Sequence, residues 1–187
     1  MQNIVFPPSI WAATAPARTQ AKPLNNDAEA DVAIVGGGFT GLSAALHLAK
    51  RGKRVILLEG NAVGWGASGR NNGQVIPTMT SAEPDAIAKR YGASGERFAR
   101  LIGNSADILF SIVRDENIDA EAEQNGWFQP AHSPGRVKLS QTRVDAWKRF
   151  GFPAEFFDRA ATSRLLGSDF WYGGMFTPTG GHINPLA

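Results

Sequence analysis

The chain contains no cysteine, which excludes disulfides, thiolate metal sites and a cysteinyl link to a flavin. It has no apolar run long enough to span a bilayer, and its N-terminus lacks the basic and apolar blocks of a secretory signal. An excess of one charge is also missing, because 19 Lys and Arg face 17 Asp and Glu. We therefore expect a cytoplasmic protein with no membrane span and no nucleic-acid partner.

Residues 31–59 carry the pattern around which the chain is organised. A short apolar segment, 31–35, predicts a buried strand, and the segment 55–58 predicts a second one. Between them, residues 42–51 are rich in alanine and leucine and predict a helix that is buried on a broad face. This order of strand, helix and strand predicts an α/β fold built on a Rossmann-like βαβ unit.

A glycine-rich turn joins the first strand to the helix. Gly36, Gly38 and Gly41 fit the pattern G-x-G-x-x-G, in which the first allows a sharp turn. The second lets backbone approach a pyrophosphate, and the third lets the helix pack closely on the sheet. Glu59 ends the second strand, where a carboxylate can accept hydrogen bonds from a ribose and would repel the 2′-phosphate of NADP. An ordinary βαβ turn with incidental glycines is the disfavoured alternative.

A second informative stretch, residues 64–74, reads Gly-Trp-Gly-Ala-Ser-Gly-Arg-Asn-Asn-Gly-Gln. Glycines and amide side chains dominate it, so it offers many backbone N–H groups and little steric bulk. Such a loop suits close approach to a polar ring or a pyrophosphate. The alternative is a flexible surface loop.

Together, residues 31–59 and 64–74 resemble the FAD-dependent amine and amino-acid oxidase family, which includes D-amino acid oxidase and glycine oxidase. The second stretch looks most like the γ-glutamylputrescine oxidase branch, although Asn72 stands where a glycine is more usual there. The resemblance implies a fold of the glutathione-reductase-like flavoprotein type, with FAD as the cofactor and a small-molecule amine as the substrate.

The same resemblance implies roles for individual residues. The glycine motif would hold the FAD pyrophosphate and Glu59 the adenosine ribose, while Ser68 and Arg70 would face phosphate oxygens. Backbone near Gly73 and Gln74 would face the flavin ring. The residues implied to contact FAD are Gly36, Gly38, Phe39, Thr40, Gly41, Glu59, Gly66, Ala67, Ser68, Arg70, Asn71, Gly73 and Gln74. We assign no catalytic residue, and no spacing of acids or histidines indicates a metal site.

Three parts follow from these assignments. Residues 1–29 predict an N-terminal arm, either loosely ordered or packed across the nucleotide domain. Residues 30–117 would form the first part of the FAD-binding domain, and residues 118–187 the beginning of an antiparallel α+β substrate domain. We expect a β-hairpin over 118–131, where Trp127 and Phe128 either line a substrate pocket or pack in the sheet core.

Helices are predicted over residues 83–91, with Ser81 near the cap, and over 94–116, whose apolar stripe we expect in the core. Another helix is expected from Ser133 to about residue 150. Near the end of the chain, Thr162 and Ser163 would cap a short helical turn that ends at Gly167, and a strand-like segment follows at 170–178.

The segment 180–187 resembles the family's G-G-x-[LI]-x-P-L, which leads into a helix returning to the flavin domain. The resemblance therefore implies that this chain corresponds to the N-terminal part of the family's length, an incomplete piece. Four hypotheses remain. The chain belongs to an FAD-dependent amine oxidase, to an amine dehydrogenase with another acceptor, or to a silent nucleotide-binding fragment. An NAD-binding domain is disfavoured, because it does not need the loop at 64–74.

Overall fold

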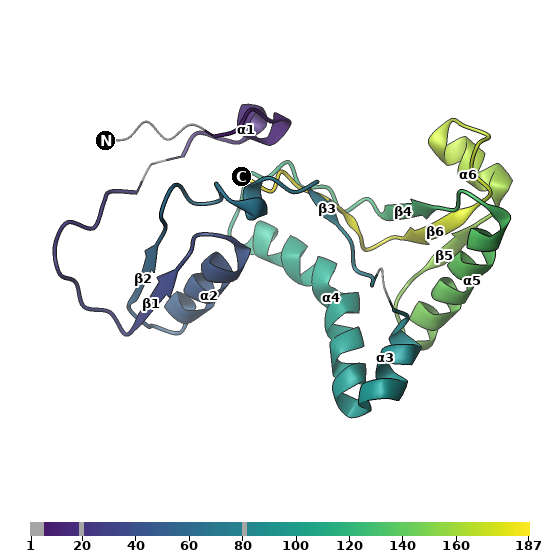
Figure 1. The fold of residues 1–187 in the computed structure, drawn as a ribbon, viewed down its shortest axis with the longest axis horizontal. Coiled ribbons are helices and arrows are strands. Elements are labelled where there is room, and N and C mark those ends of the chain that lie inside the picture. The colour runs from purple at the N-terminus through teal and green to yellow at the C-terminus, as the bar shows by residue number, and fades with distance from the viewer. Residues whose placement is uncertain (1–5, 19–20, 80–81) are drawn as a thin grey trace. The chain divides into compact units, whose positions relative to one another are not determined.

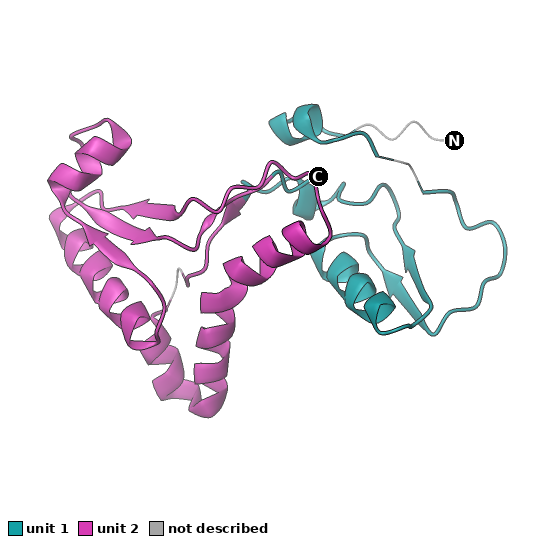
Figure 2. Ribbon diagram, turned by 180° about the vertical axis from the view of Figure 1, so that it is seen from behind, with its two compact units in different colours: residues 1–73, 184–187 teal, residues 74–183 magenta. Residues whose placement is uncertain are grey.

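A computed structural model describes residues 6–18, 21–79 and 82–187. The chain divides into two compact units (Figure 2), which we call unit 1 (residues 1–73 and 184–187) and unit 2 (residues 74–183). The predicted domain borders at residues 29 and 117 concern the cofactor and substrate parts, and they stay predictions. Within the described residues, no helix is both long and apolar enough to cross a membrane.

Unit 1 contains the βαβ element that the sequence predicts (Figure 1). Strand β1 (Val32–Val35) is followed by helix α2 (Phe39–Lys50) and strand β2 (Val55–Leu58). The two strands are parallel, and their register aligns Val32 with Val55 and Val35 with Leu58. The predicted strand–helix–strand order is therefore confirmed.

The expected burial of this element is not found. No residue of β1, α2 or β2 is buried, and Val35 is 87% exposed. Leu42, expected on the buried face of α2, is 39% exposed. The reason is the width of the sheet: in the described part of the chain it has two strands, β1 and β2. Such a narrow sheet cannot cover its own faces.

Residues 6–18 of the N-terminal arm, themselves part of unit 1, contact the loop at residues 64–74. The arm contains a one-turn helix, α1 (Ile10–Thr14), whose first turn is capped by the Ser9 hydroxyl. The Trp11 indole N–H donates to the Asn71 carbonyl at 2.8 Å. This favours the packed arm over the loose tail for residues 6–18, while residues 1–5 and 19–20 lie outside the described residues.

Unit 2 contains two consecutive helices, α3 (Pro84–Tyr91) and α4 (Ala93–Asp115), which pack side by side (Figure 1). Gly95 permits this close approach, because a Cβ atom there would lie 2.3 Å from the Ile87 carbonyl oxygen. Both predicted helices are confirmed. The expected cap residue Ser81 lies outside the described residues.

The apolar stripe of α4 is only partly in the core, which corrects the expectation. Phe98, Leu101 and Ile108 are 48%, 57% and 46% exposed. The buried line of α4 consists mainly of small residues, which let neighbouring backbone come close; its members are Gly95, Ala99, Gly103, Ala106 and Phe110. Small side chains bring partners near the helix axis, so the large neighbours are left at the rim.

The β-hairpin predicted over residues 118–131 is wrong. Only β4 (Trp127–Pro130) is a strand there, and it pairs with β6 (Gly174–Thr177) in an antiparallel sheet of order β4-β6-β5, with β5 at Glu155–Phe157. Glu121 has a left-handed φ of +47°, and that breaks any regular strand before β4. The sheet is antiparallel, as expected for this part of the chain.

A second short pair, β3 (Gln74–Val75) and β7 (Gly181–His182), is also antiparallel. Helix α5 (Pro134–Arg149) lies against β6 and β5 of the larger sheet (Figure 1). Helix α6 (Arg159–Leu166) ends at Gly167 as predicted.

The cap predicted for α6 is wrong. Asp158, not Thr162 or Ser163, caps the helix by accepting the Ala161 amide N–H. Asp158 precedes the helical residues with extended backbone, which an N-cap requires, whereas Thr162 and Ser163 lie inside the helix.

The core of unit 2 forms between α5 and the sheet. Met175, Trp147 and Val144 are buried there, and Trp127 packs against them. Phe128 meets the Phe157 ring at a centroid distance of 5.6 Å. Both aromatic residues of β4 therefore take part in core packing, the more favoured of their two expected roles.

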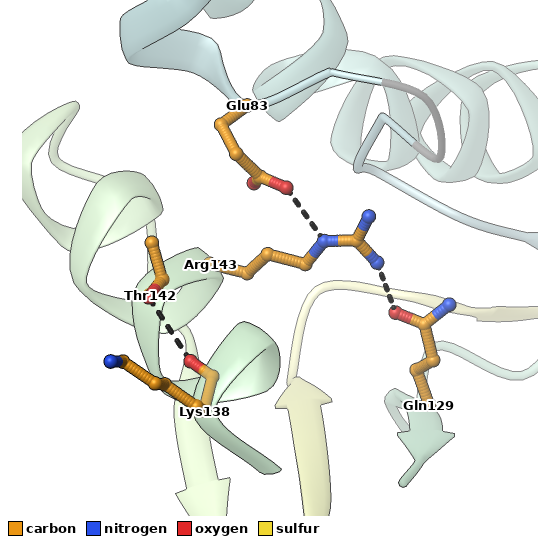
Figure 3. Close-up of polar contacts among 5 residues, drawn as sticks. All are labelled: Glu83, Gln129, Lys138, Thr142 and Arg143. Carbon is orange, nitrogen blue, oxygen red and sulfur yellow. Dashed lines mark hydrogen bonds and ion pairs between the residues drawn. The ribbon is translucent and has the colours of Figure 1, made fainter. Parts of the chain in front are cut away.

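A buried arginine ties three elements of unit 2 together (Figure 3). Arg143 of α5 donates from Nε to Glu83 Oε1 at 2.7 Å and from a terminal nitrogen to Gln129 Oε1 at 3.0 Å. The Arg143 side chain is 11% exposed and that of Glu83 21%. The pair thus fixes the start of α3 and strand β4 against α5.

Candidate cofactor site

The glycine turn of unit 1 has the geometry that a dinucleotide site needs. The Gly36 amide donates to the Leu58 carbonyl at 2.7 Å, and Gly36 has a φ of +104°, a conformation suited to glycine. A Cβ at Gly41 would lie 2.0 Å from the Gly36 carbonyl oxygen, so only glycine lets α2 pack this closely on the turn. The structural roles expected of Gly36 and Gly41 are therefore present.

Helix α2 starts at this turn with an N-terminus suited to an anion. Gly38 is its N-cap and provides no side-chain cap, and the first turn carries no acidic residue. The amides of Phe39, Thr40 and Gly41 lie in that first turn, where a helix has no carbonyls of its own for them. The positive end of the helix dipole therefore faces the turn, and no acidic residue of the helix's own first turn opposes an anion there.

Glu59 lies directly after β2, beside the glycine turn. Its carboxylate accepts the Gly37 amide N–H at 2.7 Å and the Asn61 amide N–H at 3.0 Å. These two bonds, the Gly37 bond first, hold the pKa of Glu59 below its usual range, so the group is a carboxylate at neutral pH. The acid is thus placed at the carboxyl end of its strand, as expected.

Ser68 connects the second loop to the helix N-terminus. It lies in a short 3₁₀ helix, η1 (Ala67–Gly69), and its hydroxyl accepts the Phe39 amide N–H at 3.0 Å. A Cβ at Gly38 would approach the Ser68 oxygen to 2.9 Å. The Ser68 side chain therefore lies directly against Gly38, so that a methyl group there would press on its hydroxyl.

The rest of the loop is held by its own side chains. Arg70 lies over the Trp65 ring at 4.8 Å and donates from Nε to the Gly66 carbonyl at 3.2 Å. Asn71 donates to the Ser68 carbonyl at 2.7 Å and accepts the Gly73 amide at 2.8 Å. The loop is thus a hydrogen-bonded turn in the described structure.

The predicted residues are distributed over both units. All of them except Gln74 lie in unit 1, on the glycine turn, at the end of β2 or in the loop. Gln74 lies in β3 of unit 2, where its side-chain oxygen accepts the Trp127 indole N–H at 2.9 Å. The contacts of individual residues with FAD stay predictions.

Sequence reasoning missed three contributors to this region. Gly37, the unassigned middle residue of the glycine run, is buried and supplies the amide that holds Glu59. Asn184 and Leu186 lie against the arm and the loop, since a Cβ at Gly69 would meet the Leu186 methyl at 2.4 Å. The glycine run itself signalled Gly37, whereas no local pattern pointed to Asn184 or Leu186.

Comparison with known proteins agrees with this geometry. The family described as FAD dependent oxidoreductase matches residues 31–187. The chain belongs to this family. Membership in the FAD-dependent oxidoreductases confirms three predictions from the sequence: the α/β flavoprotein fold, FAD as the cofactor and the oxidoreductase class. The glycine turn at residues 36–41 and Glu59 at the end of β2 fit that cofactor.

Two curated relatives align with most of the chain. Gamma-glutamylputrescine oxidoreductase of Escherichia coli K12 is 36% identical over 183 residues, which cover 95% of this chain and 42% of that protein. A probable oxidoreductase OrdL of Haemophilus influenzae is also 36% identical, covering 89% of this chain and 39% of its own length. The chain thus spans about two fifths of the length of these two relatives.

Solved structures show the same fold. Glycine oxidase from Geobacillus kaustophilus superposes with a TM-score of 0.69 at 21% identity, covering 84% of this chain and 41% of that one. L-Amino acid deaminase from Proteus myxofaciens gives 0.71 at 23% identity, covering 92% and 37%. At these identities the likeness supports the fold alone.

Proposed function

We propose that this chain is the FAD-binding part of an oxidoreductase that oxidises the C–N bond of an amine or amino acid to an imine. A γ-glutamylputrescine-like compound is the proposed substrate, and O₂ the proposed electron acceptor. The observation that carries the cofactor side of the proposal is the Glu59 carboxylate beside the Gly36–Gly41 turn. The 36% identity to gamma-glutamylputrescine oxidoreductase supports the substrate class.

In this proposal the residues of unit 1 divide the cofactor between them. The amides of the first turn of α2 receive the pyrophosphate, because a helix N-terminus has no carbonyls of its own for them; the Phe39 amide also donates to the Ser68 hydroxyl. Glu59 accepts hydrogen bonds from the adenosine ribose, since its carboxylate is ionised at neutral pH. Ser68 positions the Phe39 amide and lies directly against Gly38.

FAD, when bound, supplies the redox chemistry by taking up a hydride equivalent from the carbon beside the amine. The protein must hold that carbon near the flavin, keep the amine neutral and exclude water. The imine product is hydrolysed by water, and O₂ takes up the two electrons to give hydrogen peroxide. No acid or base for these steps is assigned within this chain, and the cytoplasmic location stays a prediction.

Cofactor binding and turnover should be measured separately. The purified chain is titrated with FAD and, as a comparison, with ADP and NADH, while flavin and NADH fluorescence are recorded. We expect saturable FAD binding and no NADH enhancement. ADP binding without flavin binding would favour a nucleotide-binding piece without redox function, and NADH enhancement would favour an NAD domain.

Turnover is tested with γ-glutamylputrescine, glycine, sarcosine and D-amino acids, in this chain and in a full-length homologous enzyme that contains its sequence. We expect peroxide from the full-length enzyme and none from this chain alone. If the full-length enzyme reduces an artificial electron acceptor without forming peroxide, the dehydrogenase alternative replaces the oxidase. If it oxidises none of these amines with either acceptor, the proposed substrate class is wrong.

A further inference from the structure

The N-terminal arm is held in place by long-range contacts and not by its own helix. Helix α1 has five residues, none of them buried. Isolated helices of this length are not stable in water, because nucleation costs more than one turn returns. The position of α1 must therefore come from what its side chains and carbonyls contact.

The first of these contacts reaches the predicted cofactor loop. The Trp11 indole N–H donates to the Asn71 carbonyl at 2.8 Å, across 60 residues of sequence. The Asn71 side chain in turn bonds the Ser68 carbonyl and the Gly73 amide. Gly73 has a φ of +69°, a conformation suited to glycine, and its amide is held by the Asn71 side chain. The Trp11 hydrogen bond thus holds Asn71, whose side chain closes the turn of the loop.

The second contact is made by a buried amide. Asn184 is 2% exposed, and its amide nitrogen donates to the Thr14 hydroxyl at 2.9 Å and to the Trp11 carbonyl at 3.3 Å. Its side-chain oxygen accepts the Leu186 amide N–H at 3.0 Å. The residues that make these hydrogen bonds, namely Trp11, Thr14, Asn184 and Leu186, all belong to unit 1.

Leu186 connects Asn184 to the same loop. It is 3% exposed, and its methyl group lies against Gly64 and Gly69, where added Cβ atoms would come within 3.2 and 2.4 Å. The loop at residues 64–73 is therefore contacted at two places: Trp11 bonds Asn71, and Leu186 packs against Gly64 and Gly69. Asn184 links these two contacts, because it bonds both α1 and Leu186.

We propose that the arm is a clasp that keeps the loop at residues 64–73 in the shape that receives FAD, with Trp11 and Asn184 as positioning residues. The inference rests on the proposed function, since it takes the loop to border the cofactor. The arm precedes the segment matched by the family, which begins at residue 31. The clasp therefore adds to the matched flavoprotein segment a contact that slows the release of the cofactor.

The test removes the hydrogen-bonding groups of Trp11 and Thr14. Trp11→Phe keeps an aromatic ring but lacks the N–H, and Thr14→Val keeps the shape of the side chain but lacks the hydroxyl that Asn184 contacts. Ile10→Ala is the matched control in α1, because Ile10 is 66% exposed. A net contribution of one such bond corresponds to a change of roughly 3- to 10-fold in an equilibrium constant.

Two readouts are needed. Hydrogen exchange of the peptide covering residues 66–73 is measured without FAD, and FAD dissociation is followed by the return of flavin fluorescence. We expect Trp11→Phe and Thr14→Val to speed exchange in the loop and FAD release by about 3- to 10-fold each. Ile10→Ala should match the wild type in both.

Unchanged exchange in Trp11→Phe and Thr14→Val would overturn the clasp, whatever FAD does. Faster exchange with unchanged FAD release would overturn its role toward the cofactor. If the wild type binds no FAD while Trp11→Phe still loosens the loop, the proposed function fails and the mechanical clasp stands. These outcomes separate the two proposals.

Discussion

The backbone amide of Gly37 donates a hydrogen bond of 2.7 Å to the Glu59 carboxylate. This bond connects the glycine turn to the end of the neighbouring strand, and the Asn61 amide completes the hold on the second carboxylate oxygen. Each carboxylate oxygen can accept more than one hydrogen bond, so capacity for ribose hydroxyls remains. Glu59 thus fixes the turn and, in the proposed function, also receives the sugar.

The stability that Glu59 provides should depend on pH. Its pKa is lower in the folded chain than its ordinary value, because the Gly37 and Asn61 amides stabilise the charged form. Such a group stabilises the fold above its ordinary pKa and loses that contribution as the pH falls through the lowered pKa. Glu59→Gln should therefore lower the urea midpoint at neutral pH, with a gap to the wild type that narrows as the pH falls below the ordinary glutamate pKa of about 4.3.

The control for that experiment is Glu29→Gln, at an exposed carboxylate that precedes β1. It should leave the urea midpoint unchanged at both pH values. A deficit of Glu59→Gln that is equally large at neutral and acid pH would show that the substitution acts through something other than the charge.

Gly41→Ala should destabilise unit 1. The added Cβ would lie 2.0 Å from the Gly36 carbonyl oxygen, so backbone must shift to admit it. Overpacking of this kind costs about 1–3 kcal/mol. Gly60→Ala is the matched control, because a Cβ there would meet no heavy atom within 4 Å. Urea unfolding followed by circular dichroism measures both, and equal midpoints would refute the close packing at Gly41.

Gly38→Ala should behave differently from Gly41→Ala. Its added Cβ would lie 2.9 Å from the Ser68 hydroxyl oxygen, which can rotate away. The chain should therefore stay folded while the bond from the Phe39 amide to Ser68 weakens. We expect a urea midpoint close to that of the wild type and FAD binding weakened roughly 10-fold, in line with the loss of one hydrogen bond in a narrowed site. Tight FAD binding by this variant would contradict the proposal that the cofactor binds beside Gly38.

The Arg143–Glu83 pair should be important for the stability of unit 2. Removing the guanidinium by Arg143→Met leaves the Glu83 carboxylate without the bond at 2.7 Å, and its second oxygen is buried without a partner in the described structure. We expect a loss of roughly 1.5–3 kcal/mol, the range for hydrogen bonds to charged groups. The double variant with Glu83→Gln should recover part of it.

Arg136→Met, at an exposed position of the same helix, is the control for this pair and should change the midpoint little. Additive losses in the double variant would mean that Arg143 and Glu83 do not act as a pair.

The sequence was sufficient for the features that are local. The strand, glycine turn, helix and second strand of residues 31–59 follow from apolar spacing and from glycines that have one geometric task each. The acid at the end of β2 was placed for the same reason, since side chains at a strand end must emerge beside the turn. The helices α3, α4 and α5 likewise follow from periodicity and from their glycine and proline borders.

The features that depend on distant partners could not be read from the sequence. The hairpin over residues 118–131 failed because β4 pairs with β6, which lies far along the chain. The stripe of α4 was placed in the core by its hydrophobicity, whereas the packing uses small residues. In the site, Trp11 and Asn184 act through contacts across 60 and 170 residues, for which no local spacing exists.

The most direct test of the account is the dissociation constant for FAD, measured by fluorescence titration of the wild-type chain and of Gly38→Val. The larger side chain should displace the Ser68 hydroxyl from the Phe39 amide while leaving the fold intact, as checked by its urea midpoint. We predict saturable FAD binding by the wild type and at least a 10-fold weaker binding by the variant, or about 1.4 kcal/mol. Equal affinities in the two proteins, or no FAD binding by the folded wild type, would contradict the cofactor site proposed at the glycine turn.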